Sequence, residues 1–374
     1  MHVGVVSLLG HASGVLEYTR SAIQLLELIP ELEGTVFVPR GSTLKCQRFR
    51  VVECDPPSRW RRALAYELSI LGWGASWVLT QPERVQFSGI DVFFCPYAGT
   101  YPHLFLRTPF VFTLHDLQER YHPEFFSRAQ RLDRRLLNRA LLRRATAVFC
   151  ESRFVKADIM RFFGTPERKV RVIALPPMAT FSVTPPDSAG AKRFSVSPDY
   201  FFFPSQFWKH KNHARLLVAF ERLARERPTV DLVLTGRKEY EYEHLRTWVD
   251  THALSARVHF LGYLPSEDVR ALYANARALV MPSLFESISI PVFEAFAIGT
   301  PVLCSNVVGL PEQVGDAGLL FDPTDVEAIY RAMRRILDVP ELSADLVEKG
   351  AARLRAYDRP ATARAFFEAL REAA

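Results

Sequence analysis

Residues 278–304, ALVMPSLFESISIPVFEAFAIGTPVLC, decide the fold of this chain. The stretch begins and ends with short apolar runs that suit buried strands, Ala278–Met281 and Pro301–Cys304. Between them, Pro291 suits the first position of a helix, because its missing N–H needs no partner there, and Gly299 suits the helix end. A strand, a helix and a second strand in this order predict a parallel sheet covered by helices.

The same alternation of apolar runs and helical segments extends over both halves of the chain. In the first half the predicted strands are His2–Leu8, Thr35–Val38, Asp91–Cys95, Pro109–Leu114, Thr146–Cys150 and Lys169–Ala174. In the second half they are Tyr200–Pro204, Val230–Thr235, Arg257–Leu261 and the two runs above, with helices near Asn212–Glu226, Glu239–Thr251 and Thr324–Leu337. We therefore expect an α/β chain with two Rossmann-like, doubly wound domains that face a cleft.

A segment rich in proline separates the two halves. Residues 175–190 contain four prolines among small polar residues, which is typical of an interdomain linker. The predicted organisation is an N-terminal acceptor-side domain, a linker and a C-terminal domain, at residues 1–182, 183–198 and 199–357. A last helix within residues 358–374 packs either on the second domain or back on the first, and the sequence leaves both placements open.

Length and composition exclude several classes of protein. The chain has 374 residues, 48% hydrophobic and 24% charged, which is the balance of an ordinary globular protein with two domains. Residues 63–80 are the most apolar stretch, but Glu67 and two glycines interrupt it, so we expect no membrane span. The start of the chain lacks the basic residues of a signal peptide, and the five cysteines form no CxxC pair. These features favour a reducing cytoplasm.

Basic residues gather in one segment. Residues 120–171 contain fourteen Lys and Arg against five Asp and Glu, while the rest of the chain is slightly acidic. No helix-turn-helix or zinc pattern accompanies them, so nucleic acid is not an expected partner. Peripheral contact with an anionic membrane, at the inner face of the plasma membrane, is one interpretation, and a solvated arginine-rich face is the other. Residues 63–80 are open in the same way between an interfacial helix and a core helix, with the core helix favoured.

Two carboxylates of the quoted stretch border the expected helix start. Glu286 lies in the loop before the helix and Glu294 in its first turn, where free N–H groups favour an anionic ligand. Ser287 and Ser289 are small enough to let a ligand approach the backbone. A purely structural role is the alternative for Glu294, because acids are common in first helical turns.

Further candidates lie in loops that follow predicted strands, where open α/β sheets bind their ligands. Lys211 stands beside the start of a helix, a position that suits a phosphate, although lysines on solvated loops are common. His115 follows the strand Pro109–Leu114 and suits a hydrogen bond to a substrate. The other candidates in such loops are Gly14, Gln206 and Lys209.

Taken together, these segments resemble the retaining glycosyltransferases of family four, which have the GT-B fold. Glu286 and Glu294 match the E-x7-E motif of that family. Further matches are Phe260–Pro265, Gly309–Glu312, Gly315–Pro323, Thr113–Leu117, His122–Glu124 and Glu151–Lys156. The likeness covers nearly the whole chain and is greatest for bacterial enzymes that build surface polysaccharides, often mannosyltransferases.

The resemblance implies a role for each candidate residue. Lys211 would contact the donor diphosphate, Glu286 the transferred sugar and Glu294 the ribose. His115 would contact a sugar hydroxyl near the reacting carbon, and Gly14 would let the first loop approach the phosphates. The implied catalytic residues are His115, Lys211 and Glu286, and the implied donor-binding residues are Gly14, Gln206, Lys209, Tyr263, Leu264, Ser287, Ile288, Ser289 and Glu294.

The resemblance also predicts the reaction. Gln206 stands where many family members have an arginine, so Lys209 is the expected substitute at the diphosphate. No Asp-x-Asp occupies a metal-binding setting, so we expect Lys211 and a helix N-terminus to stabilise the leaving group without a metal or another cofactor. The prediction is a retaining hexosyltransferase, with mannose as the hexose, that uses a nucleoside-diphosphate sugar and a saccharide or lipid-linked acceptor in polysaccharide biosynthesis. The alternative is a non-catalytic nucleotide-sugar-binding or scaffold protein.

Overall fold

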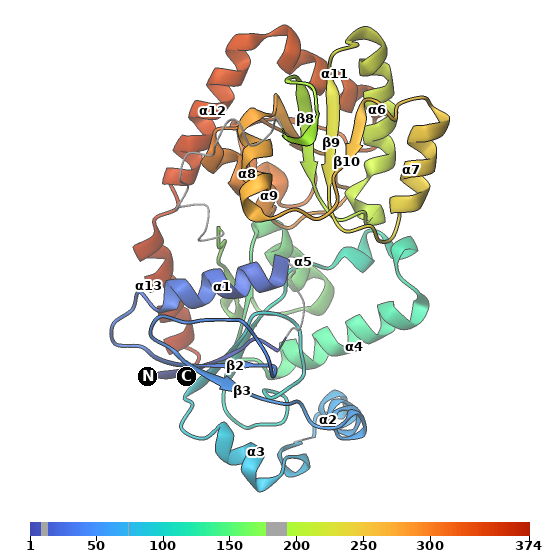
Figure 1. Cartoon of the computed structure of the whole chain (residues 1–374). Coiled ribbons are helices and arrows are strands. Elements are labelled where there is room, and N and C mark those ends of the chain that lie inside the picture. The colour runs from blue at the N-terminus through green and yellow to red at the C-terminus, as the bar shows by residue number, and fades with distance from the viewer. Residues whose placement is uncertain (9–13, 74, 177–192) are drawn as a thin grey trace. The chain divides into compact units, whose positions relative to one another are not determined.

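The computed structural model describes residues 1–8, 14–73, 75–176 and 193–374. These residues fall into two compact units, Met1–Met178 with Asp358–Ala374 and Ala179–Tyr357. Each unit is built on one sheet whose paired strands run parallel, with helices against its faces (Figure 1). The predicted class, two doubly wound α/β domains, is confirmed. Residues 183–192 of the predicted linker lie outside the described part of the chain.

The first unit contains a seven-stranded sheet in the order β3-β2-β1-β4-β5-β6-β7. Its strands are β1 His2–Val6, β2 Glu33–Val38, β3 Arg50–Glu53, β4 Val92–Cys95, β5 Phe110–Thr113, β6 Ala147–Cys150 and β7 Val170–Val172. Strands β4 and β5 are buried along their whole length, as expected where helices cover both faces. Val3 of β1 lies opposite Gly34 on one side and Val92 on the other. The strand order therefore reverses between β1 and β4, which is the topological switch point of this sheet.

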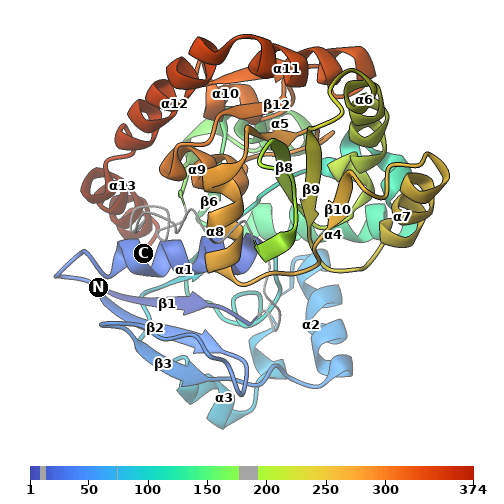
Figure 2. The same cartoon turned by 45° about the horizontal axis from the view of Figure 1, so that its top comes forward.

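The last helix of the chain belongs to this first unit. The helices here are α1 Gly14–Leu26, α2 Arg59–Leu71, α3 Gln81–Gln86, α4 Arg128–Arg144, α5 Arg153–Phe163 and α13 Arg359–Arg371, with 3-10 turns η1 Ser76–Val78, η2 Gln118–Arg120, η3 Pro123–Phe125 and η4 Glu167–Lys169. Helix α13 packs on α1 (Figure 2). Its Phe366 ring lies edge-on against the rings of Phe94 and Phe149, with centroid distances of 4.9 and 5.1 Å. The C-terminal end of the chain thus helps to build the core of the first unit.

The second unit contains a six-stranded sheet in the order β10-β9-β8-β11-β12-β13. Its strands are β8 Tyr200–Pro204, β9 Asp231–Thr235, β10 Val258–Phe260, β11 Ala278–Met281, β12 Val302–Ser305 and β13 Gly318–Phe321. Its helices are α6 His213–Glu226, α7 Tyr242–Thr251, α8 Ser266–Asn275, α9 Ile290–Ile298, α10 Leu310–Val314, α11 Val326–Asp338 and α12 Pro340–Arg355, with the 3-10 turn η7 Lys209–Lys211. Strand β8 pairs with β9 and with β11, so the loops after β8 and β11 border the switch point.

Two of the four edge strands and one outer helix were not predicted. Strands β3 and β13 form edges of their sheets, and most of their residues are exposed or half-buried. Such strands lack the continuous apolar run that marks the inner strands of a parallel sheet. Helix α12 was missed as well, because only Leu346 and Gly350 of its residues are buried.

Residues 63–80 do not form the single core helix that was favoured from the sequence. Helix α2 ends at Leu71, because Gly72 adopts a left-handed φ of 85° and closes the helix. Only one face of α2 is buried, through Ala65, Leu68 and Ser69. Across the described ranges, no helix combines the length and the apolar character that crossing a membrane requires.

The start of helix α9 also differs from the prediction. Ser289 is its N-cap, so Ile290 is the first helical residue and Pro291 the second. Glu294 is therefore the fifth residue of the helix and lies beyond the first turn, where it was expected. The helix starts one residue earlier than predicted because the hydroxyl of Ser289 accepts a hydrogen bond from the backbone N–H of Val292 and so makes Ser289 the N-cap.

Candidate active site

The two loops that border the switch point of the second sheet bring Lys211 and Glu286 together. Lys211 lies in η7 after β8, and Glu286 lies between β11 and α9. The Lys211 Nζ forms an ion pair with Oε1 of Glu286, and the two side chains are 20% and 13% exposed. The N–H of Leu284 donates to the carbonyl of His210 at 2.7 Å, which joins the same two loops through the backbone. Two residues predicted separately from the sequence thus form one half-buried charged pair.

Buried side chains fix the turn from η7 into helix α6. Asn212 is the N-cap, with a left-handed φ of 61°, and its Nδ2 donates to the carbonyls of Pro282 and Pro323 at 2.9 and 2.8 Å. His213 follows, with its ring 4.6 Å from that of Phe203. Burial and the charge of Lys211 lower the pKa of His213 to about 3, so this imidazole is neutral. These contacts hold the lysine at the start of α6, where free N–H groups add to its positive potential.

The start of helix α9 is fixed in a similar way. Ser289 is 2% exposed, and its backbone N–H donates to Oε1 of Gln313 at 2.8 Å. Its side chain is engaged as the cap of α9, so any ligand contact would be made by the neighbouring backbone. Ser287 and Ile288, which complete the loop, are half-buried. Their assignment to donor binding stays a prediction.

Glu294 is oriented by a tyrosine that the sequence did not suggest. Tyr273 of α8 is fully buried, and its Oη donates to Oε2 of Glu294 at 2.9 Å. Burial and the negative charge of Glu294 raise the pKa of Tyr273 well above its ordinary value, so the hydroxyl keeps its proton. The carboxylate of Glu294 is therefore held by a donor that does not ionise.

An arginine that was not predicted to be a site residue lies after the neighbouring strand, β9. Oε1 of Gln206 accepts a hydrogen bond from the N–H of Arg237 at 3.1 Å, which joins the loops after β8 and β9. The guanidinium of Arg237 lies 5.5 Å from the ring centroid of Tyr263, which is 65% exposed. Lys209 is 65% exposed and 4.0 Å from Glu241, and Leu264 is half-buried. Arg237 follows the predicted strand Val230–Thr235 by two residues. This position just after a strand could have identified it as a site candidate.

Gly236 makes the close approach of these loops possible. Its φ of 153° lies in the region that side chains rarely adopt, and a Cβ there would overlap the carbonyl of Ser205. Its N–H donates to the carbonyl of Gly262 at 2.9 Å. The loops after β8, β9 and β10 are therefore tied together at one edge of the sheet.

In the first unit, His115 likewise lies at the carboxyl ends of the strands. Its Nδ1 is 2.7 Å from Oε2 of Glu151, and its Nε2 is 2.8 Å from the carbonyl oxygen of Pro96. These three residues follow the adjacent strands β5, β6 and β4. Because a carboxylate and a carbonyl only accept hydrogen bonds, this arrangement favours the imidazolium form, in which both ring nitrogens donate.

The surroundings of His115 favour this charge. Burial opposes the imidazolium, but the charge and hydrogen bond of Glu151 and the carbonyl of Pro96 outweigh it, so the pKa of His115 is raised. The ring of Tyr18 packs edge-on at 4.8 Å, and its hydroxyl is 2.9 Å from Oγ1 of Thr113. Glu151 was part of a family motif in the sequence but was not predicted to be a site residue. Gly14, which was, begins α1, and the loop 9–13 before it lies outside the described residues.

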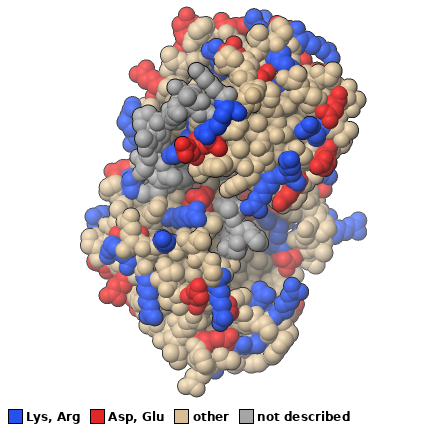
Figure 3. All heavy atoms as spheres, in the orientation of Figure 1, with Lys and Arg blue, Asp and Glu red and all other residues tan. Residues whose placement is uncertain are grey.

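Several basic side chains of the segment 120–171 form local ion pairs. Arg134 pairs with Asp116 and Glu119 at 2.8 and 2.9 Å, and Lys156 pairs with Glu167 at 3.0 Å. Acidic and basic side chains are intermixed on the face of the molecule in Figure 3. Part of the charge excess is therefore neutralised by local ion pairs, as in the solvated-face interpretation.

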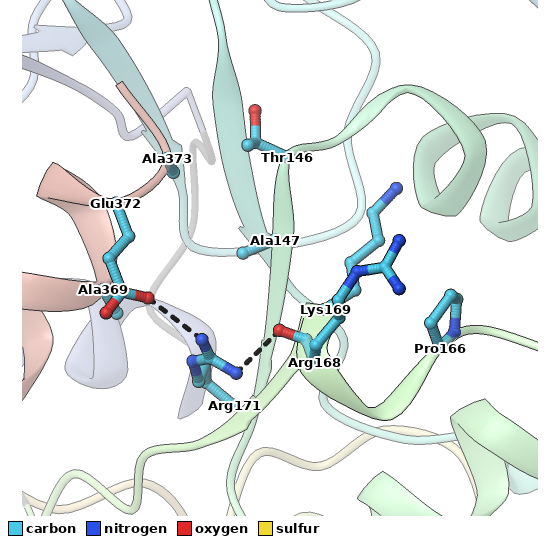
Figure 4. Close-up of a pocket in the computed structure, with 9 residues that line it drawn as sticks. All are labelled: Thr146, Ala147, Pro166, Arg168, Lys169, Arg171, Ala369, Glu372 and Ala373. Atoms are coloured by element: carbon cyan, nitrogen blue, oxygen red, sulfur yellow. Dashed lines mark hydrogen bonds and ion pairs between the residues drawn. The ribbon is translucent and has the colours of Figure 1, made fainter.

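A pocket of about 340 Å³ lies at the amino ends of strands β6 and β7 in the first sheet. It is lined by Thr146 and Ala147 at the start of β6, by Lys169 before β7 and by the end of α13 (Figure 4). Arg171 spans it, bonded to Glu372 at 2.9 Å and to the carbonyl of Arg168 at 2.6 Å. These are the amino ends of the strands, whereas ligands of such sheets bind at the carboxyl ends. In the part of the chain that the structure describes, no three His, Cys, Asp or Glu side chains gather as metal ligands.

Each of the two units matches a family model of known glycosyltransferases. Residues 20–176 match the family model Glycosyltransferase Family 4, and residues 188–353 match Glycosyl transferases group 1. O-antigen chain mannosyltransferase B of Escherichia coli is 33% identical over 236 residues, which are 61% of this chain and 60% of that protein. O-antigen chain mannosyltransferase RfbU of Salmonella typhimurium is 27% identical over 229 residues, 61% of each chain. The match spans about three fifths of the length of these curated relatives.

Solved structures share the fold over nearly the whole chain. Sucrose-phosphate synthase from Thermosynechococcus elongatus has a TM-score of 0.78 at 21% identity, covering 99% of this chain and 98% of that one. Anabaena Alr3699/HepE in complex with UDP and glucose has a TM-score of 0.74 at 18% identity, covering 99% of both chains. WaaG, a glycosyltransferase involved in lipopolysaccharide biosynthesis, has a TM-score of 0.71 at 17% identity and the same coverage.

Proposed function

We propose that this chain, which belongs to the GT-B glycosyltransferases of family 4 and group 1, transfers a hexose with retention of its anomeric configuration. The donor is a nucleoside-diphosphate sugar with mannose as its hexose, and the acceptor is a hydroxyl of a saccharide or a lipid-linked saccharide in polysaccharide biosynthesis. The similarity to two O-antigen mannosyltransferases supports the hexose and the process. The observation that carries the proposal is the Lys211–Glu286 pair at the switch point of the second sheet.

The pair explains how the site receives a charged donor. Without a ligand, the half-buried charges of Lys211 and Glu286 satisfy each other, which offsets the cost of removing them from water. A bound diphosphate takes over the ammonium, with the start of α6 adding N–H groups. Glu286 is then released to accept hydrogen bonds from hydroxyls of the sugar. Both charges thus serve the donor in turn.

Neighbouring side chains bind the nucleoside. Glu294 accepts the ribose hydroxyls, with its carboxylate kept in place by Tyr273. Arg237 supplies the guanidinium that is absent at position 206. The side chain of Gln206 fixes the loop that carries Arg237, because its Oε1 accepts a hydrogen bond from the Arg237 N–H. Tyr263 and Leu264 lie at the adjacent strand end for the base. This arrangement favours an enzyme over the non-catalytic alternative, because the missing arginine has a replacement.

The transfer itself needs stabilisation of the leaving diphosphate. The bond between the anomeric carbon and the phosphate oxygen breaks, and the acceptor oxygen bonds to the same face of that carbon. The acceptor proton passes to the departing phosphate oxygen. Lys211 and the N-terminus of α6 stabilise the negative charge, so the proposal requires no metal. His115 contacts a sugar hydroxyl near the reacting carbon.

The test is a panel of nucleoside-diphosphate sugars, each assayed for released nucleoside diphosphate with and without oligosaccharide acceptors. We expect release that depends on the acceptor and is fastest with a donor that carries mannose. The anomeric coupling of the product, measured by NMR, reports retention. Donor binding without release in any combination would refute the enzyme and support the binding protein.

A further inference from the structure

Helix α10 and the residue before it hold both ends of the loop that precedes α9. We call this loop, residues 286–289, the donor loop. At its first residue, the carbonyl of Glu286 accepts a hydrogen bond from the N–H of Gly309 at 3.0 Å. At its last residue, the N–H of Ser289 donates to Oε1 of Gln313, and Nε2 of Gln313 donates to the carbonyl of Ser289, both at 2.8 Å. Three hydrogen bonds therefore fix the backbone of the donor loop, and two of them come from one side chain.

The contacts of the donor loop with α10 are buried. Gln313 and Ser289 are 4% and 2% exposed, so their hydrogen bonds are stronger than they would be in water. Val308, which precedes Gly309, has a left-handed φ of 55°, a conformation that a β-branched residue rarely adopts. Backbone strain of this kind persists where the surrounding structure imposes it, and it is concentrated at functional sites. Here it directly precedes the N–H that bonds to Glu286.

Helix α12 holds the other end of α10. The guanidinium of Arg353 donates to the carbonyl of Gln313 at 2.6 Å and also to the carbonyl of Glu312. Gly315, which follows α10, leaves room for this guanidinium, because a Cβ there would overlap it. The carbonyls at the end of a helix also favour a cation. The position of Gln313 is therefore fixed by a second helix of the same unit.

The middle of the donor loop keeps free N–H groups. Ser287 and Ile288 are half-buried, and the N–H of neither has a hydrogen-bond partner among the described residues. Backbone N–H groups of this kind suit the oxygens of a phosphate or a sugar. The side chain of Glu286, at the start of the loop, faces Lys211. These groups can meet one ligand together only if the loop keeps one conformation.

We propose that Gln313 is a positioning residue for the donor. Together with Gly309, it holds the donor loop in the conformation that presents the carboxylate of Glu286 and the free N–H groups to the sugar and the diphosphate. Gln313 acts through Ser289, from a helix outside the motif that contains the two glutamates. The inference rests on the proposed function and adds to it the residue that fixes the shape of the donor loop.

Hydrogen exchange tests the hold on the loop without any turnover. Q313M keeps the length of the side chain and removes its amide. We expect the amides of the donor loop to exchange about tenfold faster or more, while those of β8 and β11 exchange as in the wild type. The matched control is Y200F, which removes another buried hydrogen bond of the second unit, from Tyr200 to the carbonyl of Leu272 at 2.6 Å. Tyr200 begins β8, at the amino end of the strand, so Y200F should leave the donor loop unchanged.

Binding and turnover test the consequence for the ligand. Inorganic pyrophosphate, titrated in a calorimeter, should bind Q313M about tenfold more weakly than the wild type, because displaced N–H groups lose hydrogen bonds to a charged ligand. With the fastest donor of the panel, Q313M should lower kcat by about 10–100-fold and change KM less, as expected for misplaced groups. Y200F should change neither quantity. R353M removes the support of α10 without touching the donor loop, so it should act in the same direction and carries the test if Q313M does not fold.

Several outcomes would overturn the proposal. If the donor loop of Q313M exchanges as in the wild type, Gln313 does not hold it. If the loop exchanges faster but pyrophosphate affinity and kcat equal those of Y200F, the amide is a structural bond only. Absence of pyrophosphate binding by the wild type, or equal losses in Y200F, would overturn the proposal too. Absence of turnover with every donor would refute the proposed function instead, and exchange and pyrophosphate binding would still decide the role of Gln313.

Discussion

Replacing Glu151 with glutamine removes the charge that faces His115 while keeping the shape of the side chain. The two side chains are 5% and 18% exposed, and their atoms are 2.7 Å apart, so the hydrogen bond is shielded from solvent. A hydrogen bond to a charged group contributes about 1.5–3 kcal/mol to stability. We expect E151Q to lose roughly this free energy of unfolding under conditions in which wild-type His115 is charged.

The stability difference between the wild type and E151Q should depend on pH, and the raised pKa of His115 fixes the direction of that dependence. The pKa of His115 is raised in the folded chain, so the imidazolium stabilises the fold fully below the ordinary histidine pKa, and this contribution is lost as the pH rises through the raised pKa. In E151Q, burial acts on the ring without the opposing carboxylate, and the pKa of His115 falls. The stability difference between wild type and E151Q should therefore be largest at acidic pH and should shrink as the pH rises.

Two measurements check this. NMR titration of the His115 ring follows its protonation, and hydrogen exchange of the amides in β5 and β6 follows unfolding across the same pH series. The control is E167Q, which breaks an exposed pair with Lys156 and should cost less than about 1 kcal/mol at any pH. The reasoning fails if the ring of E151Q titrates as in the wild type, or if the stability difference is the same at every pH.

Further predictions concern the second unit. K211A should lower kcat/KM by about 10²–10³, the scale for one preorganised charge at a leaving group, and a loss of only a few-fold would remove its assignment to the diphosphate. E294A should mainly raise the donor KM, because ribose contacts persist from ground state to transition state, whereas E286A should lower kcat; equal effects on KM alone would contradict these separate roles. R237A should weaken donor binding in calorimetry by about tenfold or more, as expected for a lost hydrogen bond to a charged group, and R246A is its exposed control. Turnover should survive EDTA, and a loss that Mg²⁺ or Mn²⁺ restores would show that Lys211 and α6 do not suffice.

The sequence identified the strands and part of the site for the same physical reason. Inner strands of a parallel sheet are continuous apolar runs, so their ends are visible, and polar residues just after them are site candidates. His115 and Lys211 were found in this way. Glu151 and Arg237 satisfy the same rule, since each follows a predicted strand, and applying it to every strand would have found both.

Other features of the site leave no such trace. Tyr273 reaches Glu294 from a different helix, and Gln313 reaches Ser289 from α10. The sequence shows the type of each residue but not which helix faces it will meet across the sheet. The placement of α13 on the first unit has the same origin, because an amphipathic helix fits either core and the contacts of Phe366 decide between them.

The Lys211–Glu286 and His115–Glu151 pairs differ in what they leave for a ligand. Each joins a cation to a carboxylate at the carboxyl end of a sheet, and removing one partner of such a pair costs more than the intact pair contributes. Both ring nitrogens of His115 are occupied, so a sugar hydroxyl must displace the carbonyl of Pro96 before it can bind Nε2. An ammonium has three donors, and among the described residues Lys211 spends them on Glu286 alone. Lys211 can therefore begin to bind a diphosphate before Glu286 is released to the sugar, whereas His115 must first give up the carbonyl of Pro96.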